Sequence, residues 1–178
     1  PDCYRVNCWA RGRNGEQSAH DVLRTFDRWP TWMWANEEVA EFLTWLRAHN
    51  RATGDDVGFY GLDVYSLWES MERIVGWVRD HAPDALENTV AAVRCFEPFG
   101  GDPQEYARSL RMLPDGCQDE VVALLGDLRR LVRRQGDMKE RDFDALQNSE
   151  AVAGAERYYR TMVHADGESW NVRDEHMA

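Results

Sequence analysis

The chain has 178 residues, a formal net charge of −11 and 43% hydrophobic residues, which suffices for one ordinary domain with a continuous apolar core. The acidic balance argues against nucleic acid or an anionic membrane surface as a partner, because proteins that bind phosphates normally present a basic face. No apolar run is long enough to span a membrane, so the cytoplasm is the expected compartment.

The cysteines and aromatic residues set further expectations. Cys3, Cys8, Cys95 and Cys117 show no C-x-x-C spacing, and we therefore expect reduced thiols, no metal site and no cofactor. The eight tryptophans indicate either large buried surfaces or a cleft for a bulky apolar ligand.

The first third of the chain carries three predicted elements. Residues 3–9 fit a strand or a helix, and we prefer a helix because Pro1 and Asp2 are favourable starting residues. Residues 36–50 form an amphipathic helix with an asparagine cap. Residues 57–63 follow a turn, contain β-forming residues and glycines, and predict a short buried strand.

The remainder is predicted to be helical. Ser66 and Glu69 form a capping-box pattern ahead of an amphipathic helix that ends before Pro83. Further helices are expected, in chain order, from Pro83 to Val93, from Asp102 to Leu110, from Val121 to Val132 and from Arg141 to His164.

Two features suggest that the chain is a piece of a longer protein. Asn171 and Asp174 match a helix start, but only about two turns follow, and isolated helices that short are marginal in water. The single predicted strand has no obvious partner for its backbone groups. We therefore expect a mainly α chain with one or few strands, forming the helical portion of a larger α/β domain.

Asp63 and the tryptophan-rich loop 28–34 are the first candidate sites. Asp63 lies at the carboxyl end of the predicted strand, where open α/β sheets place a ligand crevice, although turn formation explains an aspartate there equally well. The loop could line an apolar pocket with Arg28 as a handle for an anion, but packing over the core is the more frequent role.

Two further segments are polar. Residues 169–176 combine an amide, a guanidinium, carboxylates and an imidazole, as the lip of a site would, and helix capping explains part of the same pattern. We assign the basic run to the solvated face of a helix rather than to nucleic-acid binding. It consists of Arg129, Arg130, Arg133 and Arg134.

The familiar catalytic motifs are missing from the sequence. It contains no G-x-S-x-G elbow, no H-E-x-x-H pair, no phosphate-binding loop and no dinucleotide fingerprint. The five histidines stand alone, each in a predicted turn or at a helix end. The sequence motifs by themselves therefore do not indicate which reaction the protein catalyses.

Several stretches, in order and at roughly the expected spacing, together resemble the erythromycin esterase family. They are Pro1–Asn7, Arg28–Glu38, Phe59–Leu67, Tyr158–Arg160 and Ser169–Asp174. The resemblance covers essentially the whole chain. It implies an α/β core with a large helical portion and, in the true esterases, opening of a macrolide lactone by activated water without a metal, with a histidine as general base and carboxylate support.

The resemblance also implies what this chain lacks. The family's base lies in a glycine-glutamate-histidine segment upstream of the position matching Pro1, and a second histidine-bearing strand lies downstream of Ala178. We therefore assign no catalytic residue and expect residues 1–178 to be a single-domain fragment that is inactive alone and prone to self-association. An intact parent would take a bulky apolar ester.

The resemblance suggests seven residues for the wall of the substrate cleft. They are Trp32, Trp34, Asp63, Tyr65, Trp170, Asn171 and Arg173. The alternative function is a non-catalytic module for ligand binding or self-association. A histidine and a glutamate just upstream of Pro1 would favour the hydrolase.

Overall fold

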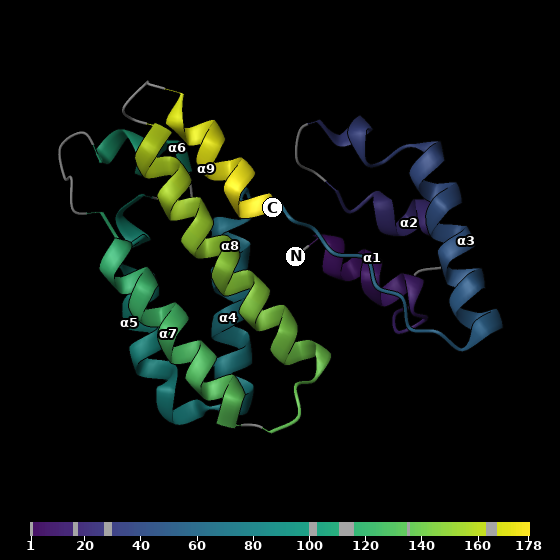
Figure 1. Ribbon diagram of the computed structural model, residues 1–178, viewed down its shortest axis with the longest axis horizontal. Helices are drawn as coiled ribbons and strands as arrows, with labels where there is room; N and C mark the ends of the chain where they lie inside the picture. The colour runs from purple at the N-terminus through teal and green to yellow at the C-terminus, as the bar shows by residue number, and fades with distance from the viewer. Residues whose placement is uncertain are drawn as a thin grey trace. The chain divides into compact units, whose positions relative to one another are not determined.

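All regular structure in the described part of the chain is helical, which confirms the mainly α class expected from the sequence (Figure 1). The computed structural model describes residues 2–15, 18–26, 30–99, 103–110, 116–134, 136–162 and 167–178. The chain divides into two compact units, residues 1–61 and residues 62–178, each with its own hydrophobic core. None of the described helices combines the length and the apolarity needed to cross a membrane.

The unit of residues 1–61 is built on its longest helix. Its helices are α1 (Asp2–Ala10), α2 (Ala19–Leu23), the 3₁₀ turn η1 (Thr31–Met33) and α3 (Glu37–Thr53). Asn36 caps α3 as predicted, since its Oδ1 accepts the Val39 N–H at 2.9 Å. α1 and α2 both pack against α3 and bury a small core. The core consists of Val6, Trp9, Ala19, Val22, Leu23, Ala40 and Leu43.

The segment 57–63, predicted to be a strand, forms no strand. Two asparagines bind its backbone instead: Asn50 Nδ2 donates to the Val57 carbonyl at 3.0 Å, and Asn50 Oδ1 accepts the Val57 N–H at 3.1 Å. Asn7 Oδ1 accepts the Phe59 N–H at 2.9 Å. Both asparagines are buried, so these side chains satisfy backbone groups that a neighbouring strand would otherwise satisfy.

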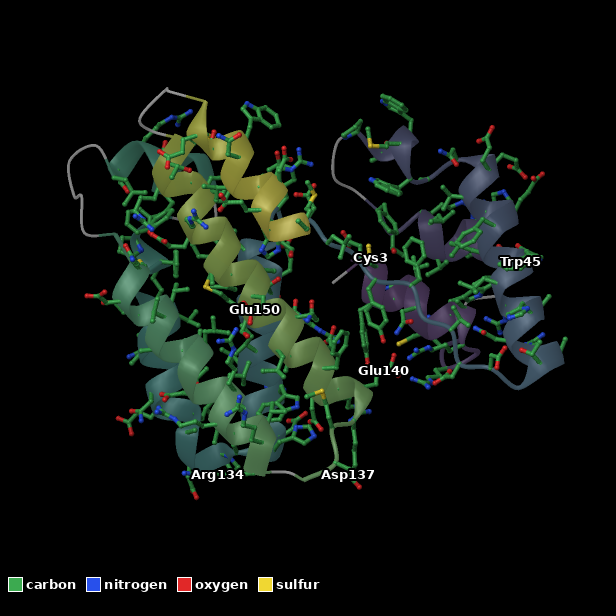
Figure 2. All side chains as sticks on the ribbon, viewed as in Figure 1. Cys3, Trp45, Arg134, Asp137, Glu140 and Glu150 are labelled. Atoms are coloured by element: carbon green, nitrogen blue, oxygen red, sulfur yellow. A yellow bond between two sulfur atoms is a disulfide. The ribbon has the colours of Figure 1, made fainter. Side chains whose placement is uncertain are left out.

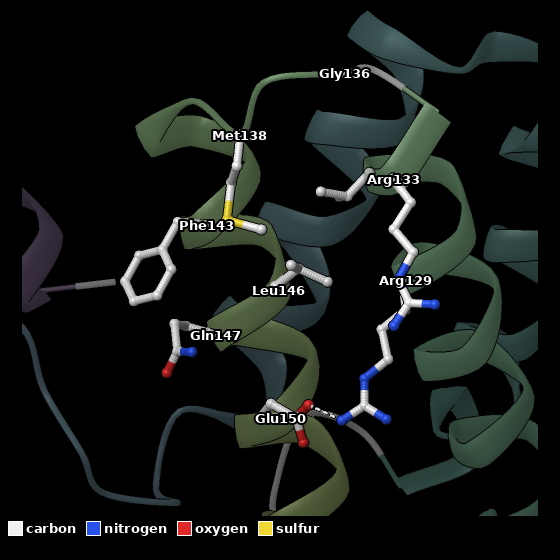
Figure 3. Close-up of a pocket in the computed structure, with 9 residues that line it drawn as sticks. Arg129, Arg133, Gly136, Met138, Phe143, Leu146, Gln147 and Glu150 are labelled. Carbon is white, nitrogen blue, oxygen red and sulfur yellow. Dashed lines mark hydrogen bonds and ion pairs between the residues drawn. The ribbon is translucent and has the colours of Figure 1, made fainter.

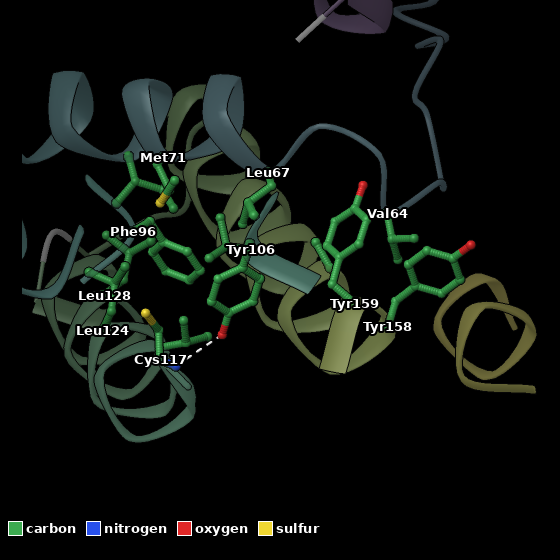
Figure 4. Close-up of a cluster of buried hydrophobic side chains, with 14 of the residues drawn as sticks. Val64, Leu67, Met71, Phe96, Tyr106, Cys117, Leu124, Leu128, Tyr158 and Tyr159 are labelled. Carbon is green, nitrogen blue, oxygen red and sulfur yellow. Dashed lines mark hydrogen bonds between the residues drawn. The ribbon is translucent and has the colours of Figure 1, made fainter. Parts of the chain in front are cut away.

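The unit of residues 62–178 surrounds a long central helix. Its elements are α4 (Leu67–His81), η2 (Pro83–Ala85), α5 (Leu86–Arg94), η3 (Glu97–Phe99), α6 (Pro103–Ser109), α7 (Gln118–Arg134), α8 (Glu140–Met162) and α9 (Glu168–Met177). α8 packs against α4, α6, α7 and α9. Figure 4 shows aliphatic and aromatic side chains of this core, among them Leu67, Phe96, Tyr106 and Leu128.

Two predicted helix starts are wrong in detail. Ser66 makes no capping bond to the backbone of α4, because its hydroxyl pairs with the Ser70 hydroxyl at 2.9 Å. α9 begins at Glu168, three residues before the predicted cap at Asn171. The preceding Gly167 has φ of 77°, a conformation that glycine adopts readily, and this turn places Asn171 inside the helix.

The expectation of reduced thiols is wrong for two of the four cysteines. Cys95, just after α5, and Cys117, just before α7, form a disulfide with their Cα atoms 5.8 Å apart. Cys3 and Cys8 are free. The two bonded residues are 22 positions apart, so only the tertiary path of the chain reveals the pair.

Candidate functional site

An arginine–aspartate pair is the centre of the candidate site. Asp63 lies on the segment that leads into α4, and Arg173 lies on α9, 110 residues later. Arg173 Nε donates to Asp63 Oδ1 at 3.0 Å, and Nη2 donates to Oδ2 at 2.6 Å. The Val64 N–H also donates to Oδ1, at 2.8 Å. This bidentate geometry fixes both side chains in one orientation.

Three aromatic rings surround the pair. The Arg173 guanidinium carbon lies 5.0 Å from the centre of the Tyr65 ring and 5.8 Å from that of the Trp170 ring. Tyr65 meets Tyr158 of α8 edge-on, with ring centres 5.8 Å apart and hydroxyl oxygens 3.5 Å apart. We call Asp63, Tyr65, Tyr158, Trp170 and Arg173 the Asp63–Arg173 cluster; all five lie in the unit of residues 62–178.

The electrostatics of the cluster follow from these contacts. Hydrogen bonds to Asp63 raise the pKa of Arg173 above its ordinary value, so the guanidinium stays charged. Burial, followed by the hydrogen bond with Tyr65, raises the pKa of Tyr158, which keeps that phenol neutral. The opposite charges of Asp63 and Arg173 offset each other, and the cluster as a whole is neutral.

The cluster is open to solvent on its aromatic side. Trp170 is 57% exposed and Tyr65 is 39% exposed, whereas Tyr158 is buried. Among the described residues, Asp63 accepts two of the five guanidinium N–H donors of Arg173, and three donors remain for another acceptor. The site can therefore offer aromatic surface and hydrogen-bond donors to one ligand without adding net charge.

The structure brings four of the seven residues suggested for the cleft together. Asp63, Tyr65, Trp170 and Arg173 belong to the Asp63–Arg173 cluster, and Asn171 is exposed on α9 beside them in the chain. Trp32 and Trp34 lie in the unit of residues 1–61, where they are 66% and 51% exposed. Arg28 and Trp29 of the same loop lie outside the described residues.

Sequence reasoning missed Tyr158 as a member of the cluster. It belongs to one of the stretches that carry the family resemblance, and that was its only signal. Its side chain reaches Tyr65 from α8, so its role depends on how α8 packs against the segment before α4.

His176 lies one turn beyond Arg173 on α9. Its ring packs so closely over Gly154 of α8 that a Cβ at position 154 would collide with it. Burial lowers the pKa of His176, against smaller opposing effects of Glu150 and Asp63. The imidazole is therefore neutral near pH 7, and its packing joins α8 to α9.

Glu156 is a buried carboxylate whose oxygens already have hydrogen-bond partners. Its Oε1 accepts a hydrogen bond from the Tyr106 hydroxyl at 3.0 Å, and Arg160 Nε lies 3.2 Å away. The Tyr106 oxygen in turn accepts the Cys117 N–H at 2.9 Å (Figure 4). Because both buried groups are occupied by partners within the core, we do not assign them to the site.

The described residues contain no group of three or more histidine, cysteine, aspartate or glutamate side chains that could hold a metal ion.

Comparison with known proteins identifies relatives over the full chain. The sequence model of the family described as erythromycin esterase matches residues 1–178. The fold is similar to the crystal structure of a succinoglycan biosynthesis protein, with a TM-score of 0.65 and 18% sequence identity. That match covers 99% of this chain and 41% of the solved chain. At this identity the likeness shows the fold alone.

Proposed function

Because the chain belongs to the erythromycin esterase family, we propose that its domain hydrolyses an ester or lactone bond in a bulky, largely apolar molecule. In this reaction the oxygen of a water molecule attacks the carbonyl carbon while a general base takes the water's proton. The carbon–oxygen ester bond then breaks, and an acid and an alcohol are released.

The observation that supports this substrate class is the neutral, partly exposed Asp63–Arg173 cluster. A neutral ester with a large apolar body needs aromatic surface and a few fixed hydrogen-bond donors rather than an excess of charge. Trp170 and Tyr65 supply the aromatic surface, and Arg173, held by Asp63, supplies the donors. Each side chain thus has a role in substrate binding, with Asp63 and Tyr158 as positioning residues.

In the proposed reaction, residues 1–178 form part of the wall of the substrate cleft. The resemblance implies that the general base and its carboxylate support lie outside residues 1–178. We therefore infer that residues 1–178 bind substrate weakly and do not hydrolyse it alone.

Acid release by the complete protein tests the hydrolase directly. We expect a pH-stat to record acid release from erythromycin or from a simpler ester when the complete protein is added, and none when residues 1–178 are added alone. Failure of the complete protein to release acid from any ester or macrolide would count against the hydrolase.

The alternative is a non-catalytic module that binds a ligand or associates with itself. Saturable macrolide binding without acid release by the complete protein would favour the binding module. Self-association is supported by exposed apolar side chains in the unit of residues 1–61: Trp32, Met33, Trp34, Phe42 and Trp45 (Trp45 is labelled in Figure 2). Light scattering that shows a clean monomer at high concentration would contradict it.

A further inference from the structure

A pocket of about 490 Å³ lies between α7 and α8, apart from the Asp63–Arg173 cluster in its lining residues. Arg129, Arg133 and Gly136 line one side (Figure 3). Val132 of α7 lines the pocket as well. Phe143, Leu146, Gln147 and Glu150 line the other, with Met138 from the connection between the helices. Arg129, Val132 and Arg133 lie on one face of α7, and Gly136 follows the end of that helix. Phe143, Leu146, Gln147 and Glu150 lie on one face of α8.

The charges of the lining residues leave one arginine available. Arg129 is paired with Glu150 across the pocket (Figure 3). Arg133, one turn further along α7, has no ion-pair partner within the part of the chain that the structure describes. Two arginines and one glutamate give the lining a net charge of +1, in a chain whose formal net charge is −11.

Four apolar side chains line the pocket together with the arginines, Gln147 and Glu150. Val132 is buried, Leu146 and Phe143 are partly buried, and Met138 is 57% exposed. A flexible methionine at the rim can adapt to different apolar shapes. Apolar side chains beside an available guanidinium are suited to a molecule that has one anionic end and one apolar end.

We propose that this pocket binds a small carboxylic acid with an apolar body. Its carboxylate pairs with Arg133, whose planar guanidinium matches the two carboxylate oxygens, and its apolar part lies against Met138, Phe143 and Leu146. A single carboxylate balances the single surplus charge of the lining. The volume lies within the usual range for small-molecule sites, about 300–1,000 Å³. The proposal does not depend on the proposed hydrolase activity.

Calorimetric titration of residues 1–178 with octanoate tests the pocket. We expect saturable binding in the low millimolar range or tighter, and at least about tenfold weaker binding of octan-1-ol and of acetate. Octan-1-ol lacks the charge, and acetate lacks the apolar body. Equal affinity for octanoate and octan-1-ol, or no saturable binding of octanoate, would overturn the proposal.

A pair of variants on the same helix locates the binding. Arg133→Gln should weaken octanoate binding about tenfold or more, the effect of losing one hydrogen-bonded charge pair. Arg134→Gln is the matched control, because Arg134 is exposed at the same end of α7 but does not line the pocket (Figure 2). Both replaced side chains are exposed, so both variants should fold. An equal effect of the two variants would contradict binding in the pocket.

Discussion

His176 makes the clearest link between one residue and the pH dependence of stability. Burial against Gly154 disfavours its charged form and lowers its pKa in the folded chain. The unfolded chain retains the ordinary pKa of histidine, near 6.5. Between the folded and the unfolded pKa, the unfolded state binds more protons than the folded state, so acidification favours unfolding.

We predict that His176 contributes a loss of stability as the pH falls from 7 to 5. The free energy of unfolding of the wild type, measured in urea, should fall more steeply over this range than that of His176→Gln, which has no titrating ring. Asn171→Ala, at an exposed position of the same helix without a titrating group, serves as the control and should keep the wild-type slope. Parallel slopes for the wild type and His176→Gln would contradict the assigned burial.

The Asp63–Arg173 pair shows what single residues could and could not reveal in the sequence. Both were singled out, Asp63 as the end of a strand and Arg173 as part of a polar segment, and both belong to the candidate site. Their bidentate pairing across 110 residues was not predicted, because it depends on the packing of α9. Asp63 also follows no strand, so that reason for selecting it was wrong, whereas the family resemblance suggested it independently.

At the scale of elements, the spacing of hydrophobic residues along the sequence predicted the helices correctly. It located the ends of the helices less accurately. The hydrophobic pattern predicted α7 correctly, because a buried stripe repeats with the period of the helix. The asparagine cap predicted the start of α3 correctly. The prediction of a strand at residues 57–63 was wrong, because apolar β-forming residues do not show where their backbone hydrogen-bond partners lie. Two asparagines supply those bonds: Asn7, which is 52 residues from its partner Phe59, and Asn50, which lies on the preceding helix α3.

The close contact of α8 and α9 depends on a glycine. We predict that Gly154→Ala destabilises the chain by about 1–3 kcal/mol, because the new methyl group displaces the His176 ring. It should also move the pKa of His176 up toward the ordinary value, as the ring becomes solvated. Urea unfolding and an NMR titration of the histidines measure the two effects.

Gly126 in the interior of α7 provides the matched control for this prediction. Apart from the backbone of α7 itself, no atom of the described residues lies within 4 Å of the position that a Cβ would take at Gly126, so Gly126→Ala should stabilise the chain by about 0.5–1 kcal/mol through helix propensity alone. If both alanine variants were stabilising, the close approach of α8 and α9 would be refuted.

The disulfide connects two further elements, the end of α5 and the start of α7. Closing a loop between positions 22 residues apart restricts the unfolded chain, which corresponds to about 3 kcal/mol in the chain-entropy model. We predict that dithiothreitol lowers the free energy of unfolding of the unit of residues 62–178 by roughly this amount. The double variant Cys3→Ala, Cys8→Ala should respond to dithiothreitol as the wild type does, and insensitivity of the wild type would contradict the bond.

The whole molecule consists of two units with separate cores, and this division bears on the candidate site. The seven residues suggested by the family resemblance are divided between the units: Trp32 and Trp34 belong to residues 1–61 and the other five to residues 62–178. The contribution of Trp32 and Trp34 to a cleft stays a prediction. The resemblance identified the family correctly over residues 1–178, whereas no pattern in the residues alone named a reaction.

The central claim is that the Asp63–Arg173 cluster binds the substrate of an ester hydrolase. Its most direct test is the steady-state kinetics of the complete protein with an ester that it hydrolyses. The variant Trp170→Ala removes exposed aromatic surface from the cluster, and Trp45→Ala, at an equally exposed tryptophan of α3, is the control.

We predict that Trp170→Ala raises KM about tenfold with little change in kcat, because the lost contact is made equally in the ground state and in the transition state. Trp45→Ala should leave both constants unchanged. Unchanged kinetics in Trp170→Ala, or an equal rise of KM in both variants, would contradict the claim.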